Sequence, residues 1–453
     1  MSERPSPVVA ILTLGCKLNQ ADSQALAREL LAHGCQVIDR AAPADAVIVN
    51  ACSVTHVADR KSRHLVRLAR RLAPAATVIL TGCYQRDGGH DLGQRLGADW
   101  LVANADKPAI AQRLLRRWQE QGRLGAGLAA VQPGDGLRTR ASVKIQEGCN
   151  EACAFCIVPR TRGRERSVPI GDVVAQVLAR QAEGAKEVVL TGTQVGNYGR
   201  DLGLARGLAD LLAALLVEST APRLRLSSLQ AQDIDEDLLR LWQNRRLCRH
   251  FHLPLQSGSD RILAAMRRRY TVDQFRRTVG LIRHRLPDVA ITTDVIVGFP
   301  GEGDEDFQRT HDLCQDLAFA AIHVFPYSPR PGTLAALAKE QVPHAVKRQR
   351  LERMLRLART SADAFRARFR GQTLEVLWED ARTRKDGQAP LWRGLTDNYL
   401  RVYTSARDGS ACGCCPGFDL ANRLLPARLG EPLADGLWGE LEPAADAPPV
   451  RVD

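Results

Sequence analysis

The sequence of 453 residues contains no long hydrophobic run. Its longest strongly apolar stretches, such as residues 208–217, are far too short to span a bilayer. The first residues, MSERPSPVVAILTLGC, contain no convincing site of signal-peptide cleavage and indicate a first strand instead. The sequence also has no solenoid-type repeat, and no low-complexity tract beyond an Ala/Pro-rich end. We therefore expect a soluble globular protein in the cytoplasm.

Structural disulfides are a further feature that we do not expect. The chain has twelve cysteines, and in the cytoplasm these should be reduced thiols or metal ligands. Lysine and arginine number 63 against 51 acidic residues, which gives a net charge of +12. Such an excess favours a polyanionic partner, although basic surfaces also occur without one. The length allows two or three domains with sizeable cores.

Three cysteines stand close together, at Cys149, Cys153 and Cys156, directly after the strand-like segment SVKIQ. Soft sulfur ligands select zinc or iron–sulfur clusters, and a [4Fe–4S] cluster normally takes four cysteines. Three thiolates would leave one iron open to a small molecule that must react there. A zinc knuckle or redox thiols are the alternative.

The first 120 residues alternate short apolar strands with amphipathic helices, which is typical of a parallel, doubly wound sheet. We expect strands at residues 8–14, 36–38, 46–49, 77–80 and 100–102. We expect helices at residues 20–33, 57–72, 92–96 and 105–119. Three of these strands run into cysteine, at Cys16, Cys52 and Cys83, and the carboxyl ends of parallel strands share one edge. The three thiols should therefore converge in one crevice, unless they are small buried side chains of the core.

A polar, Gly-rich stretch at residues 122–140 indicates a linker. Six further strands are expected after it, at residues 142–146, 187–190, 223–227, 250–255, 290–297 and 321–325. Helical patterns separate them, for example at residues 170–183, 235–242, 272–285 and 304–317. Most of these strands run into Gly, Ser or Pro clusters, which is typical of a (β/α) barrel with its site at the carboxyl ends of the strands. Six units predict an open, partial barrel, with the cysteine triad in its first loop.

The character of the sequence changes near residue 371. Residues 347–370 have the pattern of a long basic surface helix, and three strand-like pieces follow within GQTLEVLWED, LWRGLTDNYLRVYT and ANRLLPARLG. They predict a small antiparallel barrel, a fold that commonly binds RNA. Cys412, Cys414 and Cys415 lie in an extra loop of this region. Adjacent cysteines rarely share one tetrahedral ion, so we interpret them as incidental thiols.

Several longer motifs together resemble one family. They are TLGCKLNQADS, VNACSVTHVADRKSR, TGCYQ, EGCNEACAFCIVPRTRGRERS, HLPLQSGSD, TDVIVGFPGE and HVFPYSPRPGT. In these motifs the chain is similar to the radical S-adenosylmethionine (SAM) methylthiotransferases, over essentially its whole length. The resemblance implies an α/β protein in three parts: a doubly wound parallel sheet with an auxiliary cluster at residues 1–121, a (β/α)6 partial-barrel radical SAM domain at residues 138–370, and an RNA-binding antiparallel TRAM barrel at residues 371–443.

The resemblance also implies two [4Fe–4S] clusters and SAM as cofactors. In it, the triad of Cys149, Cys153 and Cys156 matches the ligands of the radical SAM cluster. The ligands of an auxiliary cluster, involved in sulfur and methyl transfer, match Cys16, Cys52 and Cys83. By resemblance Phe155 and Gly192 would lie near the adenine and amino groups of SAM. Three residues at the ends of later strands could line the same pocket, although ordinary loop usage would also explain them: Ser227, Asp294 and Gly298.

Members of this family modify isopentenyladenosine in tRNA, threonylcarbamoyladenosine in tRNA, or an aspartate of a ribosomal protein. The combination of LGCKLN with ADRKSR is most similar to the threonylcarbamoyladenosine group. It implies methylthiolation of carbon 2 of that nucleoside at position 37, with a tRNA anticodon stem-loop and an external electron donor as partners. The alternatives are the isopentenyladenosine substrate, a non-catalytic RNA-binding iron–sulfur protein, and an iron–sulfur electron carrier.

Basic residues next to the cysteines could bind RNA phosphate or the carboxylate of the threonylcarbamoyl group. Our candidates are Arg60 and Lys61, which open a helix after Cys52, and Arg160 and Arg162, which follow the triad. A solvated basic helix face is the alternative interpretation. We expect no catalytic side chains beyond the cluster ligands.

Overall fold

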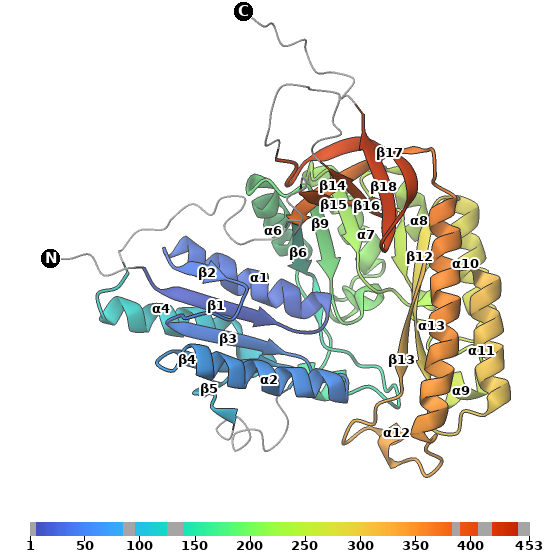
Figure 1. Ribbon diagram of the computed structural model, residues 1–453, viewed down its shortest axis with the longest axis horizontal. Helices are drawn as coiled ribbons and strands as arrows, with labels where there is room; N and C mark the ends of the chain where they lie inside the picture. Colours follow the sequence, from blue (N-terminus) through green and yellow to red (C-terminus); the bar gives the residue numbers. More distant parts are fainter. Residues whose placement is uncertain (1–5, 85–95, 125–138, 383–389, 406–418, 443–453) are drawn as a thin grey trace, which may run out of the picture.

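The computed structural model describes residues 6–84, 96–124, 139–382, 390–405 and 419–442. Figure 1 shows three parts, which are an amino-terminal sheet with helices, a curved array of strands and helices, and a small barrel at the carboxyl end. Most of the helix expected at residues 92–96 lies outside the described residues, as do Cys412, Cys414 and Cys415.

The amino-terminal part is a five-stranded sheet in the order β2-β1-β3-β4-β5, and every pair in it is parallel. Its strands are β1 (Val8–Thr13), β2 (Gln36–Ile38), β3 (Ala46–Ala51), β4 (Thr77–Gly82) and β5 (Trp100–Leu101). Its helices are α1 (Lys17–Ala32), α2 (His56–Leu72) and α4 (Pro108–Glu120), with a 3₁₀ turn at Asn104–Asp106.

Helices cover both faces of this sheet. Along β1, Val9 and Ile11 belong to the core that contains residues of α1 and α4, whereas Ala10 and Leu12 belong to the core that contains Val66 of α2. Side chains alternate between the two faces of a strand, so a strand buried on both faces is apolar throughout. This arrangement confirms the predicted doubly wound sheet.

The middle of the chain forms six parallel strands, as predicted. They are β6 (Arg140–Lys144), β9 (Glu187–Thr191), β10 (Arg223–Leu226), β11 (His250–His252), β12 (Ala290–Val297) and β13 (Ala321–Pro326). They pair as two sheets, β10-β9-β6 and β11-β12-β13, and the parallel bridge from Ser228 to His252 joins them. In the described part of the chain β6 and β13 do not pair, so the barrel is open on that side.

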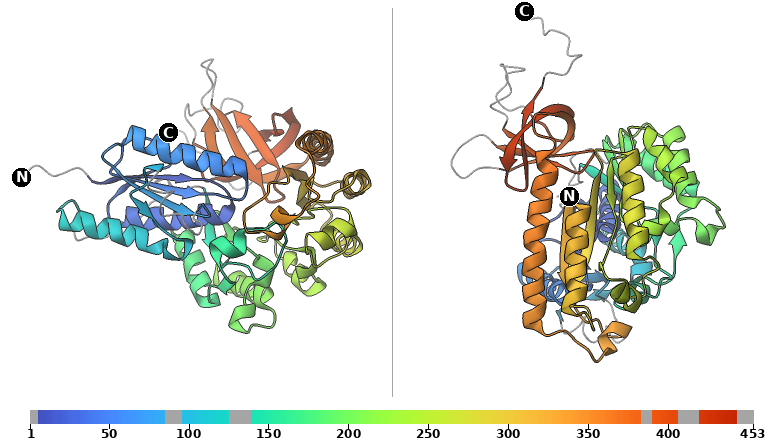
Figure 2. Two further views of the ribbon diagram at one scale, coloured as in Figure 1. Left: turned by 90° about the horizontal axis from the view of Figure 1, so that it is seen from below. Right: turned by 90° about the vertical axis from the view of Figure 1, so that its right-hand side faces the viewer.

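Helices and short elements surround these strands (Figure 2). The helices are α5 (Val158–Arg162), α6 (Ile170–Ala182), α7 (Gly207–Glu218), α8 (Glu236–Arg240), α9 (Asp260–Ala265), α10 (Val272–Arg285), α11 (Asp304–Leu317), α12 (Leu334–Leu337) and α13 (His344–Ala367). Two short strands pair near the first loop, β7 (Gln146–Glu147) and β8 (Arg166–Ser167), and 3₁₀ turns lie at Val195–Asn197, Arg200–Leu202, Ala231–Asp233 and Leu241–Gln243. Their apolar faces form one large core with the strands.

The long basic helix α13 is only partly a surface helix. Its residues Met354 and Phe365 are buried, and Arg350 is buried against Glu302, with 2.7 Å between Nη1 and Oε2. The helix therefore packs against β13 and the core of the partial barrel in addition to presenting basic residues. No described helix is long and apolar enough to cross a membrane.

The carboxyl-terminal strands close into a barrel in the order β14-β15-β16-β18-β17. They are β14 (Thr373–Arg382), β15 (Leu391–Thr396), β16 (Arg401–Ser405), β17 (Leu424–Leu433) and β18 (Gly436–Leu441). The predicted small barrel is therefore confirmed, and β18 is a strand that the sequence pattern did not reveal. β18 completes the barrel by pairing antiparallel with β17 and parallel with β16, so this last pair departs from the antiparallel arrangement that we expected.

Arginines from the amino ends of the partial-barrel strands hold the small barrel. Arg223 Nη1 donates to the carbonyl oxygen of Leu395 at 3.0 Å, and Arg225 Nη1 donates to that of Asp397 at 2.9 Å. Arg249 contacts the Asp397 carboxylate at two points, at 2.7 and 3.0 Å. The small barrel consequently sits at the end of the strands opposite to the loops that carry the cysteine triad.

Candidate active site

Three cysteines gather at the carboxyl edge of the amino-terminal sheet. β1, β3 and β4 are neighbours; Cys52 and Cys83 directly follow β3 and β4, and Cys16 comes three residues after the end of β1. The Cys83 amide donates to the carbonyl oxygen of Ala51 at 3.0 Å, which places the chain after β4 beside the chain before Cys52. Cys52 and Cys83 are buried, and Cys16 is exposed. The strand order thus brings together residues that are far apart in the sequence.

A close backbone approach accompanies this convergence. Gly15 has a φ of +96°, and a Cβ atom placed there would lie 2.7 Å from Cys52 Cβ and 2.9 Å from its Sγ. Only glycine tolerates both the left-handed backbone and this contact. Burial raises the pKa of the Cys52 thiol to about 11, and the nearby thiols of Cys83 and Cys16 also raise it. A positively charged metal group would therefore favour ionisation of the Cys52 thiol.

The second cysteine set lies in the loop after β7. The Cys149 amide donates to the carbonyl oxygen of Gly163 at 3.1 Å, and the Cys156 amide donates to the carbonyl oxygen of Cys153 at 3.1 Å. The loop is therefore folded on itself. Gly148 before it has a φ of +76°, and a Cβ atom there would lie 1.9 Å from the carbonyl oxygen of Arg164. Burial raises the pKa of the Cys156 thiol to about 12. A buried neutral thiol is expected to ionise on metal binding.

Arg268 is a neighbour of this triad that the sequence pattern did not reveal. Its Nη1 lies 3.3 Å from Cys153 Sγ, and its Nη2 donates to Gln230 Oε1 at 2.9 Å. A guanidinium beside a thiolate stabilises the thiolate charge. Arg268 follows α9 and is thus supplied by a distant part of the barrel.

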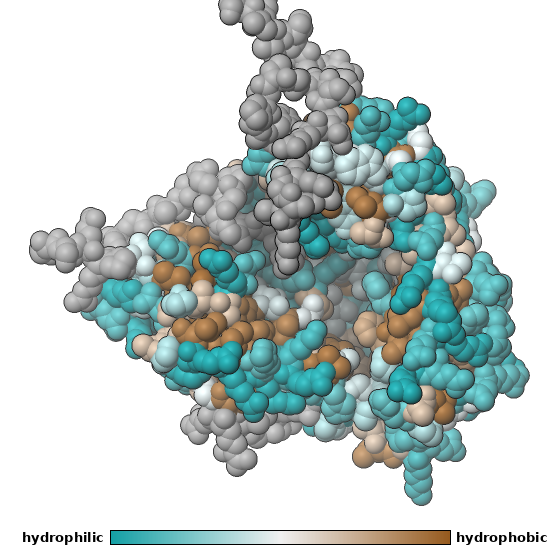
Figure 3. All heavy atoms as spheres, in the orientation of Figure 1, coloured by the Kyte–Doolittle hydropathy of each residue, from teal (hydrophilic) through white to brown (hydrophobic). Residues whose placement is uncertain are grey.

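A cavity of about 190 Å³ lies between the two cysteine-bearing parts. Val54 and Thr55, just after Cys52, form one wall, and Phe155 and Cys156 form another. The remaining lining residues are Ile157, Val158, Gln256, Asp294, Ile296, Phe325, Pro326, Tyr327 and Ser328. The surface in Figure 3 is hollowed between the amino-terminal sheet and the side that carries β13 and α13. The cavity therefore joins the surroundings of both cysteine sets.

Buried polar atoms without partners occur at the carboxyl ends of the barrel strands, and one of their residues, Gln256, lines the cavity. Among the described residues, Thr193 Oγ1, Ser227 Oγ and Gln256 Oε1 are buried and form no hydrogen bond. Buried polar atoms are normally paired, so unpaired ones at the carboxyl ends of barrel strands favour a ligand with several polar groups. SAM has such groups, and the residues present fit it in this respect.

The residues expected near SAM divide into two groups. Phe155 and Asp294 line the cavity. Ser227 is buried with its hydroxyl unpaired, as described above. Gly192 and Gly298 form the second group, because neither lines the cavity. Gly192 packs on Gln146, and the Gly298 amide donates to Glu302 Oε2 at 2.6 Å.

Two histidines flank Asp294 and were not anticipated. Asp294 accepts from His323 Nδ1 at 3.1 Å, and its other oxygen lies 3.3 Å from His252 Nε2. Although burial would raise it, the pKa of Asp294 is held well below its ordinary value by the hydrogen bonds from His252 and His323. The three residues come from adjacent strands, β11, β12 and β13. An ionised carboxylate in the cavity suits a ligand with cationic groups.

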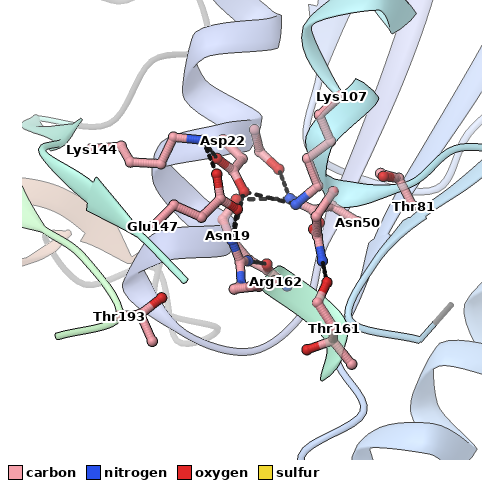
Figure 4. A network of polar contacts seen from close by, with 12 residues as sticks. Asn19, Asp22, Asn50, Thr81, Lys107, Lys144, Glu147, Thr161, Arg162 and Thr193 are labelled. Atoms are coloured by element: carbon pink, nitrogen blue, oxygen red, sulfur yellow. Dashed lines mark hydrogen bonds and ion pairs between the residues drawn. The ribbon is translucent and has the colours of Figure 1, made fainter. Parts of the chain in front are cut away.

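The four basic candidates occupy different surroundings. Arg60 and Lys61 are exposed on the first turns of α2, and Arg160 is exposed on α5, where its Nη1 donates to Gly332 at 3.1 Å. Arg162 is buried, and its guanidinium contacts Asn19, Asp22 and Glu147 (Figure 4). Arg162 thus differs from the other three candidates, because its charge meets buried partners of the protein.

Comparison with known proteins identifies the two larger parts. Residues 143–314 match the Radical SAM superfamily, and residues 8–103 match a family described as Uncharacterized protein family UPF0004. The chain is 35% identical to the threonylcarbamoyladenosine tRNA methylthiotransferase MtaB of Bacillus subtilis, over 87% of this chain and 89% of that protein. It is 33% identical to a tRNA-2-methylthio-N(6)-dimethylallyladenosine synthase of Syntrophomonas wolfei, over 95% and 97% of the two chains.

A solved structure shares the fold. The radical SAM methyltransferase TsrM from Kitasatospora setae, with cobalamin and a [4Fe–4S] cluster bound, superposes with a TM-score of 0.52 at 16% identity. The match covers 73% of this chain and 77% of that one. At this identity the likeness concerns the fold alone. The sequence relatives show that the chain belongs to the radical SAM methylthiotransferase family, whose members are sulfur-transferring enzymes that use SAM and a [4Fe–4S] cluster.

Proposed function

We propose that this enzyme methylthiolates carbon 2 of N6-threonylcarbamoyladenosine at position 37 of tRNA. Relatives named for this reaction in Bacillus subtilis, Aquifex aeolicus and Thermotoga maritima are each 35% identical to the chain. The net charge of +12 and the small carboxyl-terminal barrel support an RNA substrate, and the anticodon stem-loop is the part that carries this nucleoside. A tRNA substrate and the free thiols of the described cysteines support a cytoplasmic location.

The proposal assigns a cluster to each cysteine set. Cys149, Cys153 and Cys156 would hold the radical SAM cluster, and Cys16, Cys52 and Cys83 would hold an auxiliary [4Fe–4S] cluster. Bound there, a cluster with one iron free of protein ligands supplies the electron that cleaves SAM, drawn from an external donor. The three proposed domains are residues 1–121, 138–370 and 371–443.

The single observation that carries the proposal is the shared cavity. Val54 and Thr55 connect its wall to Cys52, and Cys156 itself lines the opposite side. A reaction that adds a sulfur-bearing group to an unreactive ring carbon needs the radical source and the sulfur source on either side of one substrate atom. Two independent electron-carrying sites would not require a common cavity.

The chain's own residues would orient the reactants. Phe155 offers an aromatic face in the cavity, and the Asp294 carboxylate, fixed by His252 and His323, offers a steady negative charge to a cationic cofactor. Ser227 offers an unpaired hydroxyl, and Gly192 and Gly298 shape the neighbouring turns. Arg60, Lys61 and Arg160 are the exposed cations available to the RNA or to the threonyl carboxylate.

The competing substrate is isopentenyladenosine at the same position. Relatives named for the dimethylallyladenosine reaction are 33–36% identical to the chain, so the identities do not separate the two substrates. Mass spectrometry of tRNA nucleosides, from cells with and without the gene, decides between them. We expect loss of 2-methylthio-N6-threonylcarbamoyladenosine and accumulation of its precursor. Loss of the isopentenyl derivative instead would reject the proposed substrate.

A further inference from the structure

A buried network of charged side chains joins the amino-terminal sheet to the partial barrel (Figure 4). Asp22 comes from α1, Lys107 precedes α4, Lys144 ends β6, Glu147 ends β7 and Arg162 ends α5. The network thus draws on both sides of the interface. It is unusual in composition, because it contains three cations and only two carboxylates.

Asp22 lies at the centre of this network. Its Oδ2 is 2.7 Å from Lys107 Nζ and 3.4 Å from Arg162 Nη1, and its Oδ1 is 2.8 Å from Lys144 Nζ. Glu147 lies 2.6 Å from Arg162 Nη1 and 3.0 Å from Lys144 Nζ. The side chains of Asp22 and Lys107 are each 3% exposed, and that of Arg162 is 2% exposed. Asp22, Lys107 and Arg162 are thus shielded from water, whereas the Lys144 side chain is 30% exposed and reaches solvent.

Asn19 connects Arg162 to the loops that carry two of the cysteines. Its Oδ1 accepts a hydrogen bond from Arg162 Nη2. Its Nδ2 donates to the carbonyl oxygens of Leu14 at 2.8 Å and Ala51 at 3.0 Å, two residues before Cys16 and one residue before Cys52. A single amide therefore fixes both loops relative to the guanidinium.

The electrostatic surroundings of Arg162 agree with this geometry. Burial opposes the charge on Arg162, but the Cys83 thiol, the Asp22 carboxylate and the Cys16 thiol outweigh it and raise the pKa of the guanidinium. A buried charge without a counter-charge is costly. Through Asn19 the guanidinium is fixed beside the loops of Cys16 and Cys52, so a negatively charged group bound there would be its counter-charge.

We propose that Arg162 is a positioning residue of the auxiliary cluster, whose negative charge completes this network. The proposal rests on the proposed function, because it presumes a cluster on Cys16, Cys52 and Cys83. An iron–sulfur cluster held by three thiolates is anionic when oxidised and more so when reduced. The buried guanidinium therefore favours the reduced form and raises the reduction potential of that cluster.

The test uses the full chain with Cys149, Cys153 and Cys156 changed to alanine, so that the auxiliary cluster is observed alone. In this background we compare Arg162→Gln, Arg162→Lys and the control Arg160→Gln. The control removes the same charge from the same short helix, but from an exposed position where solvent screens it. Iron content and the midpoint potential, followed by electron paramagnetic resonance, are measured after anaerobic reconstitution.

We expect Arg162→Gln to lower the ratio of reduced to oxidised cluster, at a fixed potential, by at least about tenfold, which is 59 mV for a one-electron couple. Arg162→Lys should stay within about threefold of the parent, because lysine keeps the charge, and so should Arg160→Gln. A fully loaded Arg162→Gln variant with the potential of the parent would overturn the inference.

If Arg162→Gln binds no iron, its potential is not measurable, and the Arg162→Lys variant tests the inference instead. Iron retained there, with a potential near that of the parent, supports the inference, because only the charge has been restored. Iron lost in the lysine variant as well overturns it, because the site then needs the shape of the guanidinium and not its charge. A parent chain that binds no iron at all would instead refute the auxiliary cluster, and with it the proposed function.

Discussion

Arg330 and Asp59 form a buried ion pair between the two parts that carry the cysteine sets. Arg330 Nη2 lies 2.5 Å from Asp59 Oδ2, and the two side chains are 2% and 11% exposed. Asp59 also accepts from Ser53 Oγ at 2.7 Å, and Ser53 directly follows Cys52. Arg330 stands two residues after Ser328 of the cavity lining. The pair therefore fixes the cavity wall of one part against the cysteine loop of the other.

Removal of either partner of this pair should be strongly destabilising. We expect Arg330→Met or Asp59→Asn to lower the free energy of unfolding by about 3–5 kcal/mol, because the remaining charge stays buried. The control is the exposed pair of Arg277 and Asp273, whose side chains are 67% and 76% exposed; Arg277→Met should cost at most about 0.5 kcal/mol. Urea unfolding of preparations with equal iron content measures the loss of unfolding free energy for the buried pair and for the exposed pair. Equal losses for the buried and the exposed pair would contradict this prediction.

The triad of Cys149, Cys153 and Cys156 should be needed for SAM cleavage. The reconstituted enzyme should bind about eight irons, from two four-iron clusters, and the triple alanine variant about half of them. Cleavage of SAM under reducing conditions should be abolished, as measured by the release of 5′-deoxyadenosine. Full iron content together with retained cleavage would show that the radical cluster lies elsewhere.

Changing Cys16, Cys52 and Cys83 to alanine should separate the two chemistries. Reductive cleavage of SAM should survive, because its cluster is untouched, whereas methylthio transfer to RNA should disappear. Chromatography of the cofactor products and of the RNA nucleosides measures the two steps in one sample. Methylthiolated RNA from this variant would exclude the proposed auxiliary cluster.

Substrate choice should depend on the threonyl carboxylate. A charge-assisted contact is worth about 1.5–3 kcal/mol, and an isopentenyl group would leave the cation without a partner. We expect turnover of an anticodon stem-loop that carries threonylcarbamoyladenosine. At the same salt concentration, we expect almost no turnover of the matched stem-loop that carries isopentenyladenosine. Arg60→Ala with Lys61→Ala should weaken this preference, whereas Arg71→Ala, at the other end of α2, should not. Comparable turnover of both stem-loops would overturn the substrate assignment.

Asp233 should make stability depend on pH. Burial raises the pKa of its carboxyl from 3.8 to about 6. Because the folded value is the higher one, the stabilising effect of the protonated form is complete below pH 3.8 and is lost as the pH rises through 6. The free energy of unfolding should therefore fall over this interval relative to Asp233→Asn, in urea titrations at several pH values. Parallel curves for the two proteins would disprove the assignment.

The strand-end cysteines were predictable because two simple regularities act together. Apolar strands alternating with helices predict parallel sheets, and parallel strands place their carboxyl ends on one edge. Cys16, Cys52 and Cys83 could thus be grouped from the sequence, and the loop position of Cys149 followed from the barrel pattern. Asp294 was expected at the end of a later strand, and it lies within β12, three residues before the end of that strand.

The roles of individual arginines were not predictable. Arg160 and Arg162 are two residues apart, and such residues point to different sides of a helix. Which side meets an interface depends on how the two parts pack, and a local pattern contains no information on that. Arg330 and Arg268 were missed for the same reason, since their partners Asp59 and Cys153 are distant in the sequence. β18 was missed because its short sequence, GLWGEL, has two glycines and little β-branched character.

The attachment of the small barrel has a consequence for how a long substrate is selected. Asp397 is gripped at two points by Arg249, and Arg223 and Arg225 hold neighbouring carbonyl groups, so the small barrel is unable to tilt without losing several bonds at once. It lies at one end of the partial-barrel strands, and the cavity lies at the other (Figure 1). An RNA bound by the small barrel and modified in the cavity would contact two sites at a fixed distance from each other. The enzyme would then select a base by its distance from the part of the RNA that the small barrel binds, as well as by its chemistry.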